Sequence, residues 1–201
     1  MESGYASLDS LFTMAPWIFL FLVPAITMRM FAEEKRSGTL ELLFTRPVSE
    51  WQIVISKFLA AWILVLISII PTLPYFVSVY LLGAPQGNID TGGTWGSYIG
   101  LLFLGGIYAA LGVYSSSLTD NQIVAFILAV LLSFLFYLGF DLLSTVFAQG
   151  EFVHLVEKLG IQFHYLSISR GVLDSRDLIY FAAVIFIFLY ATRYVLLSRK
   201  W

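Results

Sequence analysis

Cysteine is absent from this chain of 201 residues, and charged residues make up only 12% of it. The lack of cysteine excludes disulfide frameworks, thiolate metal sites and cysteine nucleophiles. Ordinary globular chains contain about 25% charged residues, so too few polar side chains remain here to cover a water-soluble globule of this size. The net charge of −2 argues against a nucleic-acid partner, because such a partner calls for a basic patch.

Motifs for chemistry are missing as well. The sequence has no HExxH, no GxSxG and no phosphate-binding loop of the GxxxxGKS or GxxxxGKT type. We therefore expect no catalytic residue, no metal ligand and no cofactor in this chain. His154 and His164 are the only histidines, and their pattern favours plain amphipathic surface over a metal site. Asp141 is the one acid inside an expected span, near its end, where an exposed or capping role is favoured.

Apolar residues are abundant instead, at 59% of the chain with a mean hydropathy of +0.87. A helix needs about 20 mostly apolar residues to cross the hydrocarbon of a bilayer. Five segments meet this requirement, at about 11–31, 58–82, 95–118, 123–147 and 178–197. They lack the two-residue alternation of barrel strands, and helices satisfy every backbone group internally. The sequence predicts an all-α integral membrane protein with a single transmembrane domain over residues 1–201.

Lysine and arginine are distributed unevenly between the two sides that five spans define. One side holds eight of them and the other holds Lys158, Arg170 and Arg176. The richer side is expected to be cytosolic, which places the N-terminus outside and the C-terminus in the cytosol. The first span lacks a basic leader and a small-residue cleavage site, so we do not expect a signal peptide.

The predicted cytosolic connection, 32–57, has two parts. A charged cluster at 33–36 comes first, and the stretch 38–44 follows with leucines and a phenylalanine at three- and four-residue spacing. Pro47 ends this stretch, because the residue before a proline is disfavoured in the α region. The pattern predicts a short amphipathic helix at the inner membrane interface.

The next helix is expected to begin at Ser49, which forms a capping box with Gln52 and continues into the second span. Two interpretations of the amphipathic stretch before it stay open. It is either a surface helix that dips its leucines into the headgroups, or a docking site for a cytosolic partner. Periodicity alone does not separate them, since both require the same pattern.

The predicted outer connection, 148–177, has thirty residues and an interfacial character. Two short helices, separated at Gly160, are expected to lie at the outer leaflet. Either Asp174 or Asp177 can cap the last span. In the third span, glycine, alanine and serine recur at four-residue spacing from Gly96 to Ser116. Such spacing lets helices approach closely, within one chain or between two.

Three segments resemble ABC-2 type transporter permeases. They are 31–43 with 47–49 after it, 116–125 and 170–181, and they occur in the order that the family shows. The nearest resemblance is to the gliding-motility-associated (GldF-like) permease subunits of Bacteroidetes, with copper-site-assembly permeases as neighbours.

The resemblance implies a six-span fold, a dimer and a separate cytosolic ATPase that docks on a short helix. It implies ATPase-coupling roles for Glu33, Glu34, Gly38, Thr39, Leu40, Glu41, Leu43, Phe44 and Pro47. It implies an inner-loop motif at Ser116, Leu118, Thr119, Asn121 and Gln122, and an outer motif at Gly171, Asp174, Asp177 and Tyr180.

Because only five spans are present, we expect the family's first helix to be absent and the sequence to be a fragment or to start from an internal methionine. The expected partners are an ABC ATPase subunit that carries ATP and magnesium, a second permease subunit in a homodimer or heterodimer, and the bilayer of a bacterial inner membrane. The predicted function is a permease subunit of an ATP-driven exporter that serves gliding motility. The alternative is a membrane scaffold or anchor of a motility or secretion assembly that transports no solute.

Overall fold

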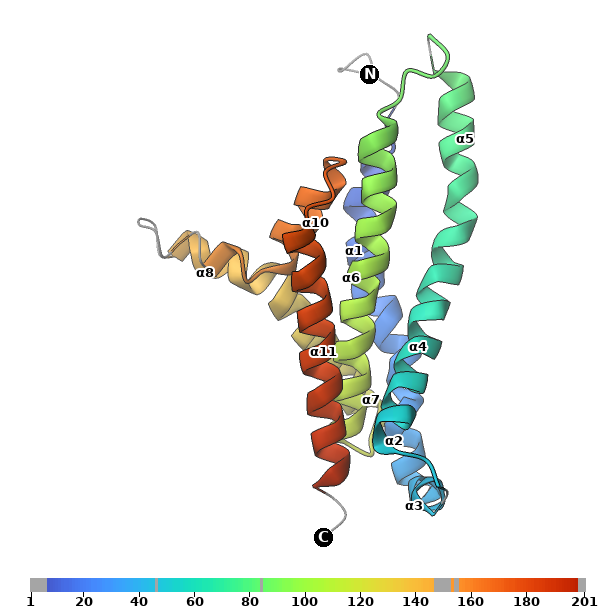
Figure 1. Cartoon of the computed structure of the whole chain (residues 1–201), viewed down its shortest axis with the longest axis vertical. Coiled ribbons are helices and arrows are strands. Elements are labelled where there is room, and N and C mark those ends of the chain that lie inside the picture. The colour runs from blue at the N-terminus through green and yellow to red at the C-terminus, as the bar shows by residue number, and fades with distance from the viewer. Residues whose placement is uncertain (1–6, 46, 84, 147–152, 154–155, 199–201) are drawn as a thin grey trace.

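The computed structural model describes residues 7–45, 47–83, 85–146, 153 and 156–198. Within these residues the chain forms helices and no strands (Figure 1). They are α1 (Asp9–Thr27), α2 (Arg29–Arg36), α3 (Thr39–Phe44), α4 (Glu50–Ile69), the 3₁₀ helix η1 (Ile70–Thr72), α5 (Leu73–Leu82), α6 (Thr91–Leu118), α7 (Gln122–Phe134), the π-helix η2 (Leu135–Gly139), α8 (Phe140–Val146), α10 (Ile161–Ser169) and α11 (Ser175–Leu197).

Five stretches of the described helices are long and apolar enough to cross a membrane. They are Asp9–Arg36, Glu50–Leu82, Thr91–Leu118, Gln122–Thr145 and Ser175–Leu197. The prediction of an all-α protein with five spanning helices is therefore confirmed. The capping box is confirmed too: the Ser49 N–H donates to Gln52 Oε1 at 3.0 Å, and the Gln52 N–H donates to Ser49 Oγ at 3.3 Å.

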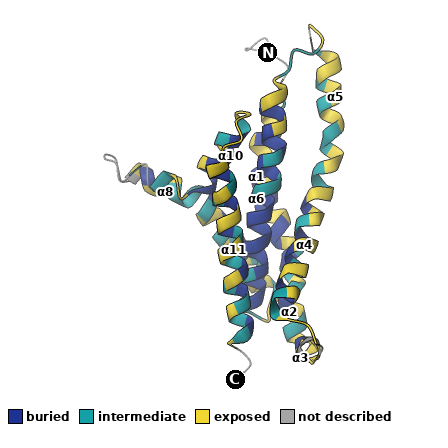
Figure 2. Ribbon diagram, viewed as in Figure 1, coloured by how far each residue is buried: buried dark blue, intermediate teal, exposed yellow. Residues whose placement is uncertain are grey.

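Helix α6 is the axis of the bundle, with α1, α4, α7, α10 and α11 packed around it (Figure 2). Its small residues face other helices of the same chain. A Cβ on Gly112 would collide with Thr27 of α1, and one on Gly105 would collide with Val65 of α4. A Cβ on Gly96 would collide with the Ile168 carbonyl of α10. The four-residue spacing of small residues thus serves helix contacts inside one chain.

The second span bends at η1, where Pro71 lies. Beyond the bend, α5 stands apart from the rest of the bundle and contains no buried residue (Figures 1 and 2). Two hydrogen bonds fix the preceding part of this span, α4 and η1, to α6. The Trp62 Nε1–H donates to the Leu102 carbonyl at 2.9 Å, and the Tyr98 hydroxyl donates to the Thr72 carbonyl at 2.9 Å.

The fourth span is not one continuous α-helix. The π-helix η2 follows α7, and α8 then projects sideways from the bundle (Figure 1). π-Bulges are a recognised cause of sharp helix bends. Asp141 consequently lies exposed in the first turn of the projecting α8.

Candidate functional site

At one end of the bundle lie α2, α3, the α6–α7 connection and the last turns of α11; we call this the α3 end (Figure 1). One buried hydroxyl ties its elements together. Ser116 Oγ of α6 accepts hydrogen bonds from the backbone N–H groups of Phe31 and Ala32, both at 3.0 Å, and donates to the Met28 carbonyl at 2.9 Å. The junction of α1 and α2 is thereby fixed to α6.

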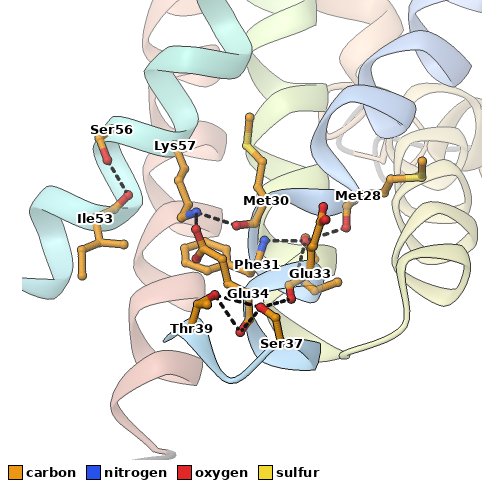
Figure 3. Close-up of polar contacts among 12 residues, drawn as sticks. Met28, Met30, Phe31, Glu33, Glu34, Ser37, Thr39, Ile53, Ser56 and Lys57 are labelled. Carbon is orange, nitrogen blue, oxygen red and sulfur yellow. Dashed lines mark hydrogen bonds and ion pairs between the residues drawn. The ribbon is translucent and has the colours of Figure 1, made fainter. Parts of the chain in front are cut away.

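An ion pair fixes α2 to α4 (Figure 3). Lys57 Nζ lies 2.5 Å from Glu34 Oε1, donates to the Met30 carbonyl at 2.5 Å, and sits 4.8 Å from the centre of the Phe31 ring. Both charged side chains are largely buried, at 17% and 26% exposed, so the pair is screened less than a surface pair would be. Helix α2 is consequently held by two spans besides the one it continues.

Helix α3 leaves this junction through a tight turn. Gly38 has a φ of +73°, a left-handed conformation that glycine adopts without strain. Ser37 Oγ and Thr39 Oγ1 lie 2.9 Å apart in the same turn. On α3 itself, Leu40 is 8% exposed, whereas Leu42 is 65% exposed. The helix therefore anchors one leucine in the protein and presents the other to its surroundings.

The structure sorts the predicted coupling residues into three groups. Glu34 and Leu40 face inward, and Glu34 forms an ion pair with Lys57. Exposed positions are Glu33, Gly38, Thr39, Glu41 and Pro47. The side chains of Leu43 and Phe44 lie outside the described residues.

The predicted inner-loop motif builds the turn between α6 and α7. Thr119 Oγ1 accepts from the Asn121 N–H at 3.1 Å, and Asn121 Oδ1 caps α7 by accepting from the Ile123 N–H at 2.9 Å. Leu118 ends α6 with its side chain exposed, and Gln122 begins α7. Lys35 Nζ of α2 donates to the Ser117 carbonyl, so this turn also touches α2.

At the opposite end, which we call the α10 end, a buried histidine organises the predicted outer motif. His164 Nδ1 lies 2.7 Å from Asp177 Oδ1, and His164 Nε2 lies 2.8 Å from the Lys158 carbonyl. The imidazole stacks on the Tyr180 ring at 3.9 Å between centres, and the Tyr180 hydroxyl donates to the Leu159 carbonyl at 2.6 Å. The sequence-based interpretation of His164 as surface is wrong, because the ring is 8% exposed and fills the space between α10 and α11.

The other members of the outer motif shape the connection into α11. Asp174 is the N-cap residue, since its Oδ1 accepts from the Arg176 N–H at 2.9 Å. Gly171 has a φ of +83° and packs against the backbone of Gly92, whose carbonyl carbon would lie 2.8 Å from an added Cβ. His154 lies outside the described residues. Among the described residues, no group of three or more acidic or histidine side chains could hold a metal ion.

A family model described as "ABC-2 family transporter protein" matches residues 2–156. The matched region takes in α1 to α8, and so both the α2–α3 segment and the α6–α7 connection. Comparison with curated proteins gives no match.

Proposed function

This chain belongs to the ABC-2 family of transporter membrane proteins and is a transport subunit, and we propose that its α2–α3 segment is the docking site for a separate ATPase. The exposed part of this segment supports the proposal. Leu42 is exposed, and the exposed carboxylates Glu33 and Glu41 lie on the same short segment. An apolar contact with charges around it is the usual composition of a protein interface.

The observation that carries the proposal is the double attachment of α2. Ser116 fixes its first turn to α6, and Lys57 fixes Glu34 to α4. A partner that moves α3 therefore moves the ends of three spans together. We propose that ATP binding closes the partner ATPases, which tilts α2 and α3 and shifts the population between inward-facing and outward-facing arrangements.

For this mechanism the α3 end must lie in the cytosol, and we propose this orientation. The distribution of lysine and arginine in the sequence supports it, because the five-span topology predicts eight of them on the side of segment 32–57, namely Arg29, Lys35, Arg36, Arg46, Lys57, Arg193, Arg199 and Lys200. The N-terminus is then outside a bacterial inner membrane and the C-terminus inside. ATP and magnesium would bind in the partner ATPase.

Three finer assignments complete the proposal. We propose that the chain pairs with a second permease subunit, that transport is outward, and that it serves gliding motility. Their support is the resemblance of segments 31–43, 116–125 and 170–181 to permeases of that kind.

The orientation can be tested by labelling single cysteines, because the chain has none of its own. Glu41→Cys in α3 and Gln86→Cys in the connection between α5 and α6 are both at exposed positions. In intact cells a membrane-impermeant maleimide should label Gln86→Cys alone, and Glu41→Cys should react only after the membrane is opened. Labelling of Glu41→Cys in intact cells would place α3 outside and remove the docking proposal.

The docking itself can be tested by co-purifying the full chain with ABC ATPase subunits from the same organism. We expect the double variant Glu41→Lys, Leu42→Glu to lower the recovered ATPase at least about tenfold, the equivalent of about 1.4 kcal/mol. Asp120→Lys is the matched control, since Asp120 is exposed at the same end of the bundle. Equal recovery with both variants would refute docking at α3. An ATPase that binds but can lose hydrolysis without loss of the cellular phenotype would favour a scaffold over a transporter.

A further inference from the structure

Two adjoining cavities open at the α10 end, between α1, α6 and α10. Their volumes are about 290 Å³ and about 320 Å³. Both are lined by Asp9, Phe12, Ser97 and Ser169, so we treat them as one cleft and call it the α10-end cleft. A volume of this size matches the smaller pockets that hold organic ligands in proteins.

Polar groups without protein partners line this cleft. Ser97 is 4% exposed and Tyr137 is 5% exposed, yet neither hydroxyl makes a hydrogen bond with the described residues. Gln162 Oε1, in the same lining, is buried and also lacks a donor among them. Buried polar atoms in proteins are nearly always hydrogen-bonded. Gln162 Oε1 is such an atom, and together with the two cleft-facing hydroxyls it offers hydrogen-bonding positions to a polar ligand.

The charge of the lining has one sign. Asp9 and Asp90 are its only charged side chains, and the described lining contains no lysine, arginine or histidine. Asp90 is partly engaged, because its Oδ1 caps α6 by accepting from the Gly93 N–H at 3.0 Å. Asp9 makes no ion pair with the described residues. An anionic ligand would be repelled here, whereas a cationic one would gain an ion pair with Asp9.

Aromatic rings form the apolar wall of the cleft. Trp17 is 41% exposed, and its ring meets that of Tyr137 edge-on with 6.0 Å between centres. The π-helix η2 carries Tyr137, so the bend of the fourth span places this ring against α1. Aromatic faces attract ammonium groups through the negative potential above the ring.

A hydrogen bond between α10 and α1 keeps the cleft in shape. The Tyr165 hydroxyl donates to the Phe12 carbonyl at 2.8 Å. Burial raises the pKa of the Tyr165 hydroxyl well above its ordinary value, so this donor keeps its proton at physiological pH. The negative charge of the cleft accordingly comes from the carboxylates and not from a phenolate.

We propose that the α10-end cleft binds an organic cation: an ammonium group between Asp9, Gln162 and the Trp17 ring, with its apolar body along the aromatic wall. The ammonium supplies the donors that the carboxylate and the amide oxygen accept, and the ring supplies the cation–π contact. The inference rests on the proposed function, because it makes the cleft an outer-side subsite for the transported compound.

The test uses the purified full chain in a neutral detergent and three probes that share one benzene ring. Benzylammonium is cationic, benzyl alcohol is neutral and benzoate is anionic at neutral pH. Calorimetric titration should detect benzylammonium binding, with the other two probes weaker by at least about tenfold. Equal binding of benzyl alcohol or benzoate would overturn the assignment of a cation.

Two substitutions locate the binding. Asp9→Asn should weaken benzylammonium at least about fivefold, and Trp17→Phe should weaken it less, by about threefold. Asp120→Asn is the matched control, since this exposed acid lies at the α3 end and should change nothing. Asp9 and Trp17 are both exposed enough that the variants should fold, which elution as a single species would show. Unchanged affinity in Asp9→Asn would overturn the proposal.

This test is independent of the ATPase. If benzylammonium fails to bind while the α3 variant still loses the ATPase, the subsite is wrong and the permease assignment stands. If benzylammonium binds as expected while the α3 variant keeps the ATPase, the docking site is wrong and the cleft stands.

Discussion

Helices α5 and α6 are neighbours along the chain and both belong to apolar spans, but they are packed very differently. The most apolar stretch of the span that contains α5 has a mean hydropathy of 2.6 and is 28% buried. The corresponding stretch of α6 has a mean hydropathy of 1.6 and is 83% buried. The less apolar helix is therefore the more buried one, which is the reverse of what holds in a soluble protein.

The side chains explain the reversal. Lipid is as apolar as leucine, so a large apolar residue gains little by leaving it, and close backbone approach decides which helix is central. Gly105 and Gly112 of α6 lie directly against Val65 and Thr27. In α5 most of the exposed residues are large, and these are Tyr75, Val77, Tyr80, Leu81 and Leu82.

The largest effect should follow from enlarging a small residue in α6. In Gly112→Val the new side chain would occupy the position of Thr27, whose Cβ would lie only 2.8 Å from the added Cβ. We expect a cost of about 3 kcal/mol or more, seen as a lower midpoint of thermal unfolding in detergent. The matched enlargement Ser78→Val in α5 is exposed and should leave the midpoint almost unchanged. Equal effects of the two substitutions would show that α5 and α6 tolerate added side-chain volume alike, despite their different burial.

A double-mutant cycle would identify the contact itself. Gly112→Ala should be less harmful in a Thr27→Ala background, because the hydroxyl and methyl groups that collide are then gone. Strict additivity of the two changes would show that Gly112 is needed for another reason.

Much of the fold could be predicted from the sequence, because its signals are local. Long apolar runs indicated five spans, and the capping box at Ser49 and Gln52 marked the start of α4. The bend at η2 could not be predicted, since no proline marks it and its leucine, phenylalanine and tyrosine also suit a straight helix. The exposed orientation of Leu42 against the buried Leu40 required knowing what lies behind α3.

The sites depend on pairs of residues that are distant in the chain. Lys57 was recognisable only as one more positive charge, and its partner Glu34 only as part of a charged cluster. Ser116 belonged to a recognisable motif, but its bonds to Phe31 and to Met28 cross more than eighty residues. His164 was interpreted as surface because an isolated histidine gives no sign of the carboxylate that it will meet.

The second-largest effect should come from the polar anchor at the α10 end. His164→Ala removes the partner of the buried Asp177 and also the stacking on Tyr180. We expect a loss of about 2–3 kcal/mol of stability, measured as the thermal midpoint. Arg176→Ala, an exposed change in the same region, should have little effect. A harmless His164→Ala would mean that small residues alone hold α10 and α11 together.

A smaller effect is expected from Ser116→Ala at the α3 end. The change leaves the N–H groups of Phe31 and Ala32 without their acceptor in a buried position. We expect a cost of about 1–2 kcal/mol in stability. We also expect slower ATP-driven transport with the partner ATPase, because α2 is then attached to one fewer span. Ser198→Ala, an exposed serine at the same end, is the control. Loss of stability with full coupling would assign Ser116 a structural role alone.

The smallest effect concerns the hydrogen bond at the foot of α5. Tyr98→Phe removes only the donor to the Thr72 carbonyl, so the free energy of unfolding should fall by about 1 kcal/mol or less. Because α5 has no buried residue to hold it, this loss should instead widen its range of positions. Spin labels on Thr13→Cys of α1 and Ser78→Cys of α5 should then give a broader distance distribution, while a Thr13→Cys, Leu64→Cys pair across α1 and α4 stays narrow. If both pairs broaden alike, the bond supports the whole bundle, and the contrast between a fixed α6 and a loosely held α5 is weaker than their burial indicates.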